Sequence, residues 1–423
     1  MAVPGEAPPL DEAFCNSTRI ERDALGPLAL PADALYGIHT ARALKNLSFS
    51  HRALRSCAPY TRALGIVKGV AAGANAEAGV LAPELALAIE RASGQVSSGV
   101  FDHALVADLL GGGGSIAVHM NVAEVIANVA SESLGGRRGG YVPIHPKQHV
   151  NASQSTADVC HTALRLAILE RGAVLLAGLE ALAATTDAKI RELGHVPTLA
   201  RTCLQDALPT TLALLFAGHA ALVRRRAKEL AHSLEALHDV TLGGTVIGTG
   251  QGAPPRYRER VVPLLAARTG LDLRAHPAPG DALQNADDVG AVSAQLALLA
   301  HGLAKIAQDL RLLASGPRGG MGELALPHVQ EGSSFFADKS NPLVAETLLQ
   351  SCFQTLGCDR AVQAGLEHGE LYLNVFDGLA AVNVLDALEL LANAILRFRE
   401  RCLEGLAANE ARCRELASFG RTS

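Results

Sequence analysis

Residues 155–193, STADVCHTALRLAILERGAVLLAGLEALAATTDAKIREL, are the stretch from which the fold class follows. Apolar residues recur in it at the spacing of a helix face. The same spacing recurs at residues 61–96, 208–237, 281–313, 343–365 and 379–403. Helices this long, apolar on more than one face, are usually buried in a bundle, often across subunits. The sequence therefore predicts an all-α fold with a long central helical bundle, assembled as a homo-oligomer.

The composition favours the same class. Of 423 residues, 49% are hydrophobic, 19% charged and only 4% aromatic, and tryptophan is absent. Such a mixture favours packed helices over sheet, and the length allows a large core and more than one domain. The formal net charge of −5 provides no general basic field. We therefore expect no nucleic-acid partner.

Cysteine usage and the N-terminus indicate a cytoplasmic protein. Eight cysteines are scattered without a CxxC pair, as expected for reduced thiols. Residues 1–14, MAVPGEAPPLDEAF, lack the basic and apolar regions of a secretion signal. The apolar segments 173–185 and 289–306 are interrupted by Glu180, Gln295 and His301, which we expect to keep them below membrane-spanning length.

Glycine-rich segments at residues 110–115, 243–250 and 316–320 separate the predicted helices and are the loops in which chemistry is expected. None has the spacing of a P-loop or a dinucleotide fingerprint. His119, His149 and His161 show no metal-ligand spacing. We expect neither a metal nor another cofactor.

Residues 332–342, GSSFFADKSNP, place two hydroxyls, a cation and an amide in one short loop before a predicted helix. Lys339, Asn341 and backbone amides can together bind a carboxylate, and a serine whose ionised form those amides stabilise can act as a base. A structural explanation also exists, because Asn341-Pro342 is a good N-cap followed by proline at the first helical position. This string alone leaves both interpretations open.

The string resembles the GSSxMPxKxNP signature loop of the aspartase/fumarase superfamily. Residues 149–158, HVNASQSTAD, are similar to its HVNxSQSxND motif, and residues 201–207, RTCLQDA, to its RTHLQDA motif. Segments within 19–40 and 398–410 resemble aspartases in particular. The resemblance implies an N-terminal helical domain at 1–150 and a central long-helix domain at 151–405. Family members continue into a small C-terminal helical domain, so residues 406–423 are expected to be a truncated remnant of it.

The resemblance also implies a reaction: anti elimination from a substituted succinate, with fumarate as product, in sites built from three subunits of a homotetramer. Ser333 matches the catalytic base. The proton beside a carboxylate is very weakly acidic, so the doubly charged aci-carboxylate intermediate must be stabilised electrostatically. The positions matching those that hold the two carboxylates are Ser155, Thr156, Thr202, Ser334, Lys339 and Asn341. Capping of the long helix is an alternative or additional role for Ser155 and Thr156.

The departures from the family fall in the leaving-group pocket. Where the family has the Thr of GTSxNMN, the Asn of SxND and the His of RTHLQ, this chain carries Ile116, Ala157 and Cys203. Ile and Ala cannot hydrogen-bond an ammonium, and Cys does so weakly. Each lost hydrogen bond costs about 1–3 kcal/mol, which should make aspartate a poor substrate. We expect a bulkier or less cationic leaving group, such as a substituted amine.

Three smaller expectations concern the same regions. The Cys203 thiol should fill the space of the lost imidazole rather than act as a nucleophile. Phe335 and Phe336 should pack beneath the signature loop, with the sealing of a more apolar pocket as the alternative role. Phe336, Ala337 and Asp338 stand where the family usually has Met-Pro-Gly, and the loss of this Pro and Gly should alter how the loop bends.

Two alternatives to this function remain. One is plain aspartate ammonia-lyase with a rearranged amino pocket. The other is a catalytically silent pseudoenzyme or scaffold subunit that binds dicarboxylates weakly or not at all.

Overall fold

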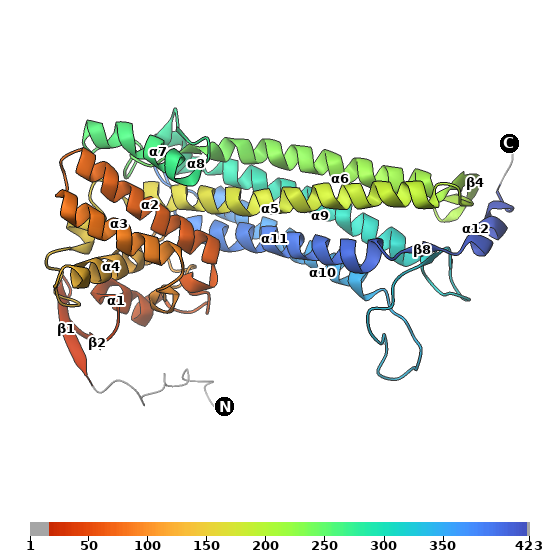
Figure 1. Ribbon diagram of the computed structural model, residues 1–423, viewed down its shortest axis with the longest axis horizontal. Coiled ribbons are helices and arrows are strands. Elements are labelled where there is room, and N and C mark those ends of the chain that lie inside the picture. Colours follow the sequence, from red (N-terminus) through yellow and green to blue (C-terminus); the bar gives the residue numbers. More distant parts are fainter. Residues whose placement is uncertain (1–16, 421–423) are drawn as a thin grey trace. The chain divides into compact units, whose positions relative to one another are not determined.

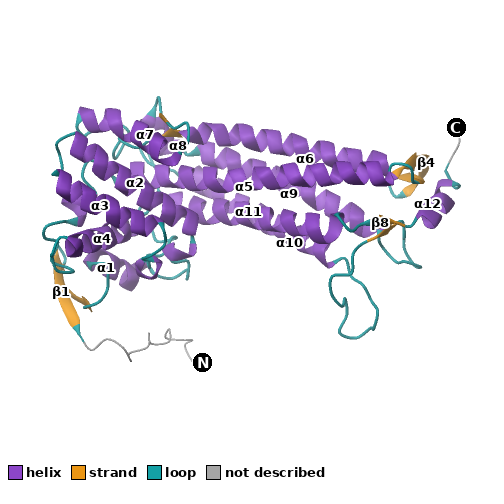
Figure 2. Ribbon diagram, viewed as in Figure 1, coloured by secondary structure: helices purple, strands orange, loops and turns teal. Residues whose placement is uncertain are grey.

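The computed structural model describes residues 17–420. Nearly all regular structure in this range is helical (Figures 1 and 2), which confirms the predicted all-α class. Residues 1–14, on which the argument about a secretion signal rests, lie outside the described residues, as does Cys15.

The helices are α1 (Ile38–Leu47), α2 (Ala58–Glu77), α3 (Pro83–Ser97), α4 (Ile116–Ser133), α5 (Thr156–Leu193), α6 (Leu212–Glu235), α7 (Pro255–Thr269), α8 (Pro279–Asn285), α9 (Asp287–Leu313), α10 (Leu343–Glu367), α11 (Asp377–Phe398) and α12 (Glu410–Ala417). Short 3₁₀ or π turns are η1 (Leu54–Ser56), η2 (Asp102–Ala104), η3 (Pro146–Val150), η4 (Ala236–His238) and η5 (Arg399–Leu403). The strands form two-stranded ribbons: β1 (Thr18–Asp23) with β2 (Gly26–Pro31), β3 (Pro197–Thr202) with β4 (Gln205–Thr211), β5 (Asp239–Val240) with β6 (Arg274–Ala275), and β7 (Leu324–Ala325) with β8 (Ala407–Ala408).

The long helices lie close to their predicted positions, with three differences. The segment 61–96 forms two helices, because Gly79 (φ +74°) ends α2 and Pro83 begins α3. Helix α6 begins only at Leu212, since the residues before it form β4. Ala286 (φ +49°) interrupts the helix predicted from residue 281 and separates α8 from α9.

The chain forms two compact units made of alternating segments. Unit 1 comprises Met1–Leu164, Asp239–Asn285 and Gly369–Gly378, and unit 2 comprises Arg165–His238, Ala286–His368 and Leu379–Ser423. The boundaries between them fall within α5 and α11, among other places. The domain boundaries expected from the sequence near residues 150 and 405 remain a prediction.

Unit 1 is built around α2, which packs against α3 and α7, while α4 packs against α1 and α3. Leu64, Val67 and Ile89 are fully buried between these helices. A Cβ at Gly65 would lie 2.7 Å from the backbone nitrogen of Ser97. The absence of a side chain there lets α2 approach the end of α3 closely.

Unit 2 is built around α9, which packs against α6 and α10. Leu299 and Leu303 are fully buried on α9. A Cβ at Gly302 would lie 2.5 Å from the Leu222 side chain of α6. The absence of a side chain at Gly302 thus lets α6 and α9 come into close contact.

Two helical stretches, Asp287–Leu313 and Asp377–Leu403, are long and apolar enough to cross a membrane by length and composition. The expectation that Gln295 and His301 would keep the first stretch below membrane-spanning length was wrong, because the mean hydropathy of this Ala- and Leu-rich helix stays high despite these two polar residues. Buried shares of 56% and 50% in their most apolar windows are also typical of core helices in a bundle. Two such helices are weak evidence for a membrane protein.

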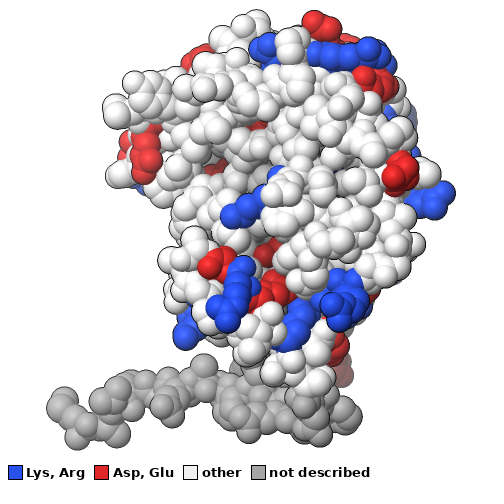
Figure 3. All heavy atoms as spheres, turned by 90° about the vertical axis from the view of Figure 1, so that its left-hand side faces the viewer, with Lys and Arg blue, Asp and Glu red and all other residues white. Residues whose placement is uncertain are grey.

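Charged side chains on the face shown in Figure 3 are of both signs. Lys and Arg lie beside Asp and Glu, and wide uncharged areas separate the groups. This face presents mixed charge rather than a broad basic surface.

Candidate functional site

The start of α5 carries three predicted site residues. Ser155 caps the helix: its Oγ accepts the Asp158 backbone N–H at 3.4 Å, and the Asp158 carboxylate accepts the Ser155 N–H at 2.8 Å. This reciprocal pair is a capping box, so the capping role considered from the sequence is confirmed for Ser155. Thr156 is half-buried and its hydroxyl contacts His119 instead, while Ala157 is buried.

Asp158 also ties α5 to the glycine-rich segment 243–250. Its Oδ2 accepts the backbone N–H groups of Gly243 and Thr245, each at 3.1 Å. Burial raises the pKa of this carboxyl, and its three backbone donors act in the opposite direction. The buried carboxylate therefore holds the glycine-rich segment against the start of α5.

A chain of polar contacts leads from Thr156 into the core of unit 1. Thr156 Oγ1 lies 2.9 Å from His119 Nδ1 on α4, and His119 Nε2 lies 2.5 Å from Lys68 Nζ on α2. Lys68 Nζ also donates to Asn151 Oδ1 at 2.6 Å and to Gln154 Oε1 at 2.9 Å. Lys68 and His119 are buried, with 0% and 2% of their surface exposed. These contacts join α2 and α4 to the start of α5.

Burial governs the titration of this cluster. It lowers the pKa of Lys68 to about 7, opposed by the electrostatic influence of Cys160 and Asp158. Burial also lowers the pKa of His119 well below its ordinary value, and the Lys68 ammonium acts in the same direction. The imidazole is therefore neutral at pH 7, with one ring nitrogen donating and the other accepting.

Ile116, the first residue of α4, lies one turn before His119. Its side chain is 37% exposed, and the preceding Ser115 adopts a left-handed conformation (φ +62°) at the end of the glycine-rich segment. The predicted leaving-group position thus carries a partly exposed apolar side chain at the start of α4.

Thr202 and Cys203 lie at the tip of the β3–β4 hairpin. Thr202 pairs with Gln205, so Cys203 and Leu204 form the two-residue turn, with φ of +52° and +59°. This is the primed turn geometry that usually takes Asn or Gly. Cys203 is exposed at this hairpin tip in the single chain. That its thiol fills the space of an imidazole remains a prediction.

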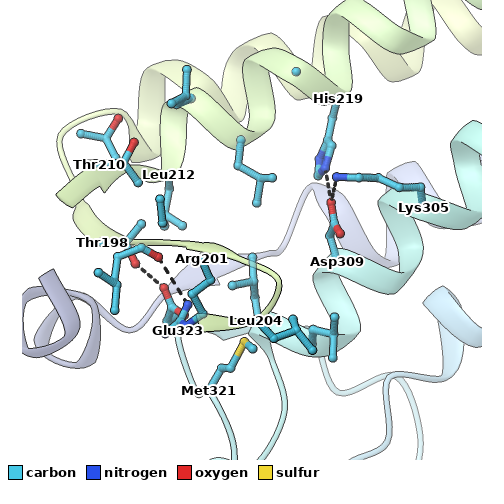
Figure 4. A pocket seen from close by; sticks show the side chains of 18 of the residues that line it. Thr198, Arg201, Leu204, Thr210, Leu212, His219, Lys305, Asp309, Met321 and Glu323 are labelled. Carbon is cyan, nitrogen blue, oxygen red and sulfur yellow. Dashed lines mark hydrogen bonds and ion pairs between the residues drawn. The ribbon is translucent and has the colours of Figure 1, made fainter. Parts of the chain in front are cut away.

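The base of this hairpin borders a pocket of about 510 Å³ (Figure 4). Arg201 pairs with the buried Glu323 carboxylate at 2.6 Å, and the Thr198 hydroxyl donates to the same carboxylate. On another side of the pocket, His219 Nε2 lies 2.8 Å from Asp309 Oδ2. The polar groups are thus largely paired with one another, and the remaining lining includes the apolar side chains of Leu199, Leu204, Leu212, Leu215, Leu312 and Leu313.

Ser333 lies in an exposed loop before α10, as predicted. Its Oγ accepts the backbone N–H groups of Phe335 at 3.1 Å and Phe336 at 2.9 Å. Two amide hydrogens therefore point at the oxygen that the sequence analysis assigned as the base. These donors would favour its ionised form over a free hydroxyl.

The two ends of this loop are held together. Asn341 Nδ2 donates to the Gly332 carbonyl at 2.5 Å, and the Gly332 N–H donates to the Lys339 carbonyl at 3.0 Å. Asn341 is not the helix cap that the structural explanation required, because Pro342 occupies the N-cap position of α10. Ser334 and the Lys339 side chain are exposed.

One expectation about the loop was wrong, and another remains untested. Phe335 and Phe336 are 84% and 59% exposed and contact each other edge to face, so they do not pack beneath the loop in the single chain. Asp338 adopts φ +63°. Asp tolerates this left-handed conformation better than most residues. That the loss of Pro and Gly alters how the loop bends remains a prediction.

The predicted residues lie at four places in the fold. Unit 1 holds Ser155, Thr156 and Ala157 at the start of α5 and Ile116 at the start of α4. Unit 2 holds the hairpin pair Thr202 and Cys203, and the loop residues Ser333, Ser334, Lys339 and Asn341. That all of them meet in one site remains a prediction.

The roles of Lys68 and Asp158 were not predicted from the sequence, and His119 was considered only as a metal ligand. Lys68 is the single charged residue in the apolar run ALGIVKGVAAGA at 63–74, a signal that was available. Asp158 follows Ser155 by three residues, the spacing of a capping box. No local signal connects His119 to Thr156.

Within residues 17–420, no group of three or more His, Cys, Asp and Glu side chains is arranged to hold a metal ion.

The sequence is similar to known lyases over most of its length. A family described as Lyase matches residues 26–357. The chain is 42% identical to an aspartate ammonia-lyase of Pseudomonas canavaninivorans over 406 residues, which cover 95% of this chain and 85% of that protein. It is 38% identical to a class II fumarate hydratase of Methylorubrum extorquens, with coverage of 95% and 85%.

Solved structures agree with this similarity. A fumarate lyase:delta crystallin from Brucella melitensis, bound to cobalt, matches with a TM-score of 0.92 at 41% identity, covering 95% of this chain and 87% of that one. A recombinant class II fumarase from Schistosoma mansoni matches with a TM-score of 0.92 at 28% identity and the same coverage.

Proposed function

Because this chain belongs to the aspartase/fumarase superfamily of lyases, we propose that it forms fumarate from a substituted succinate, or catalyses the reverse addition. Ser333 takes the proton beside one carboxylate. The C–H electron pair passes through the aci-carboxylate into the new double bond, and the carbon–nitrogen bond breaks with its pair on the leaving nitrogen.

The observation that carries this proposal is the environment of Ser333 Oγ, which accepts two backbone N–H groups. A serine hydroxyl is a weak base unless its ionised form is stabilised. Donors already directed at the oxygen lower the cost of that ionisation. The same loop carries the Lys339 cation, which favours negative charge nearby.

We propose that the substrate's two carboxylates are held by Ser155, Thr156, Thr202, Ser334, Lys339 and Asn341. These residues come from separate segments, and large apolar side chains are exposed along the long helices: Val174 (48%), Leu214 (68%), Leu298 (47%), Phe353 (59%) and Leu396 (40%). Burying such faces between copies favours association. We propose a homotetramer in which three subunits contribute to each site.

The leaving group is proposed to be a nitrogen group other than plain ammonia. Ile116 and Ala157 supply no side-chain donor or acceptor, and Cys203 supplies a weak one. Aspartate ammonia-lyase activity is the second candidate. The 42% identity to a protein named aspartate ammonia-lyase favours this second candidate. The leaving-group pocket differs from that of the family at only three positions.

Purified protein mixed with L-aspartate, malate and a panel of N-substituted aspartates tests the proposal, with fumarate followed by its ultraviolet absorbance. Rapid fumarate release from a substituted compound, with little from aspartate, is expected. Fast deamination of aspartate would select the second candidate. Release from none of the compounds would count against both and favour the pseudoenzyme.

Ser333→Ala should abolish turnover, whereas Ser340→Ala, which removes an exposed hydroxyl of the same loop, should not. Equal activity of the two variants would remove Ser333 from the role of base. Restoring the family residues with Ala157→Asn and Cys203→His should raise the rate with aspartate, since both side chains hydrogen-bond an ammonium. An unchanged rate would contradict the explanation of the altered pocket.

We propose a cytoplasmic location. No disulfide joins any two of the seven cysteines among the described residues, as is usual in a reducing compartment. Fractionation of the native host, with this protein followed by antibody, would test the assignment.

A further inference from the structure

The direction of each hydrogen bond to the buried Lys68 follows from the other hydrogen bonds that its partners make. The Gln154 amide nitrogen donates to the Val150 and Ala152 carbonyls, both within 3.0 Å, so its Oε1 must face Lys68. Asn151 Oδ1 and His119 Nε2 complete three acceptors around Lys68 Nζ. Three acceptors match the three donors of an ammonium group.

This arrangement selects one tautomer of His119. When Lys68 is an ammonium it donates all three of its hydrogens, so Nε2 accepts one of them and carries no hydrogen, and the hydrogen of the neutral ring is on Nδ1. Nδ1–H then donates to Thr156 Oγ1 at 2.9 Å. Within the part of the chain that the structure describes, this is the hydroxyl's one hydrogen bond, so its own O–H stays available as a donor.

We propose that Lys68 and His119 are positioning residues that set the Thr156 hydroxyl as a donor toward a substrate carboxylate. The inference rests on the proposed function and deepens it, because it states why this part of the site accepts an anion. A hydroxyl that accepts a hydrogen bond from an imidazole directs its own hydrogen away from the ring. The Lys68 cation on the other ring nitrogen polarises the imidazole and so strengthens the hydroxyl as a donor. A substrate ammonium group has no acceptor for the hydrogen that the Thr156 hydroxyl presents, so this part of the site would not bind it.

The burial of Lys68 supports a role beyond packing. An ammonium with 0% exposure carries a large desolvation cost, which a methionine of similar length would avoid. Among residues 17–420, three polar groups and no carboxylate form a direct hydrogen bond with the Lys68 ammonium. The charged or titratable groups that act on it are Asp158 and Cys160 of α5 and His119 of α4.

A double-mutant cycle on succinate affinity tests the proposal, measured by calorimetry on the full chain. Lys68→Met and Thr156→Val should each weaken succinate binding about tenfold. In the Thr156→Val background, Lys68→Met should cause no further loss, because the hydroxyl that Lys68 orients is gone. Lys45→Met, at an exposed lysine of α1, is the matched control and should bind succinate as the wild type does.

Variants of His119 give the same cycle if Lys68→Met does not fold. In His119→Gln the amide takes the place of Nε2, so an acceptor toward Lys68 is kept and the donor toward Thr156 is lost. In His119→Asn the amide takes the place of Nδ1, so the donor toward Thr156 is kept. We expect the Gln variant to bind succinate more weakly than the Asn variant, and its loss to vanish in the Thr156→Val background. Additive losses in the cycle, or unchanged affinity in Lys68→Met and His119→Gln, would overturn this inference alone. A wild-type protein that does not bind succinate would overturn the proposed function and this inference with it.

Discussion

Replacing Lys68 by methionine should remove a pH dependence from the stability of this protein. Lys68 is fully buried, and burial lowers its pKa from 10.5 to about 7. Methionine has a similar length and no charge, so Lys68→Met removes the titration while largely keeping the packing. The three acceptors that lose their donor add a loss that is the same at every pH.

The sign follows from proton binding. The unfolded chain keeps the Lys68 proton up to about pH 10.5, whereas the folded protein releases it above about pH 7, so in this window the unfolded state binds more protons. The destabilising effect of Lys68 is therefore complete below pH 7 and declines as the pH rises. Where the two states differ by one bound proton, each pH unit changes the free energy of unfolding by about 1.4 kcal/mol. Lys68 is half-titrated at about pH 7. Between that pH and about pH 9, the free energy of unfolding of the wild type should rise by roughly 2 kcal/mol relative to that of Lys68→Met.

Urea unfolding followed by circular dichroism, at one protein concentration and at pH values from about 7 to about 9, measures this difference. His119 stays neutral throughout the range because its pKa is already lowered, so it does not contribute. Lys45→Met should follow the wild type at every pH. Curves for the wild type and Lys68→Met that stay parallel across the range would refute the assignment of a buried, titrating ammonium at Lys68.

Asp158→Ala should lower the free energy of unfolding by about 3–5 kcal/mol, because three backbone donors lose their acceptor, and Asp158→Asn by roughly half as much; denaturant midpoints measure both. Gly248→Ala should lower the melting temperature, since a Cβ there would lie 2.3 Å from the Gly280 nitrogen and φ is +83°; an unchanged value would contradict the close approach. Asn341→Ala should speed proteolysis within residues 332–342 by releasing the Gly332 carbonyl. The unfolding midpoint of the whole protein should change little, because the loop is exposed.

The central helices could be predicted because apolar periodicity is a local property of the chain. Gly79 and Pro83 were also local signals, and they end one helix and begin the next. The break at Ala286 carried no such signal, since alanine rarely adopts a left-handed conformation and favours a continuous helix. The β3–β4 turn at Cys203 and Leu204 was equally hidden, because neither residue is typical of a primed turn.

The sequence by itself determined the all-helical class, the lyase family and the candidate residues, because short motifs keep their order and spacing whatever the packing. Only the tertiary structure decided which polar groups meet. His119 reaches Thr156 across 37 positions of the chain, and Lys68 reaches Gln154 across 86. The direction of the Thr156 hydroxyl depends on those distant partners, since a hydroxyl rotates toward whichever donors and acceptors the packed helices bring to it.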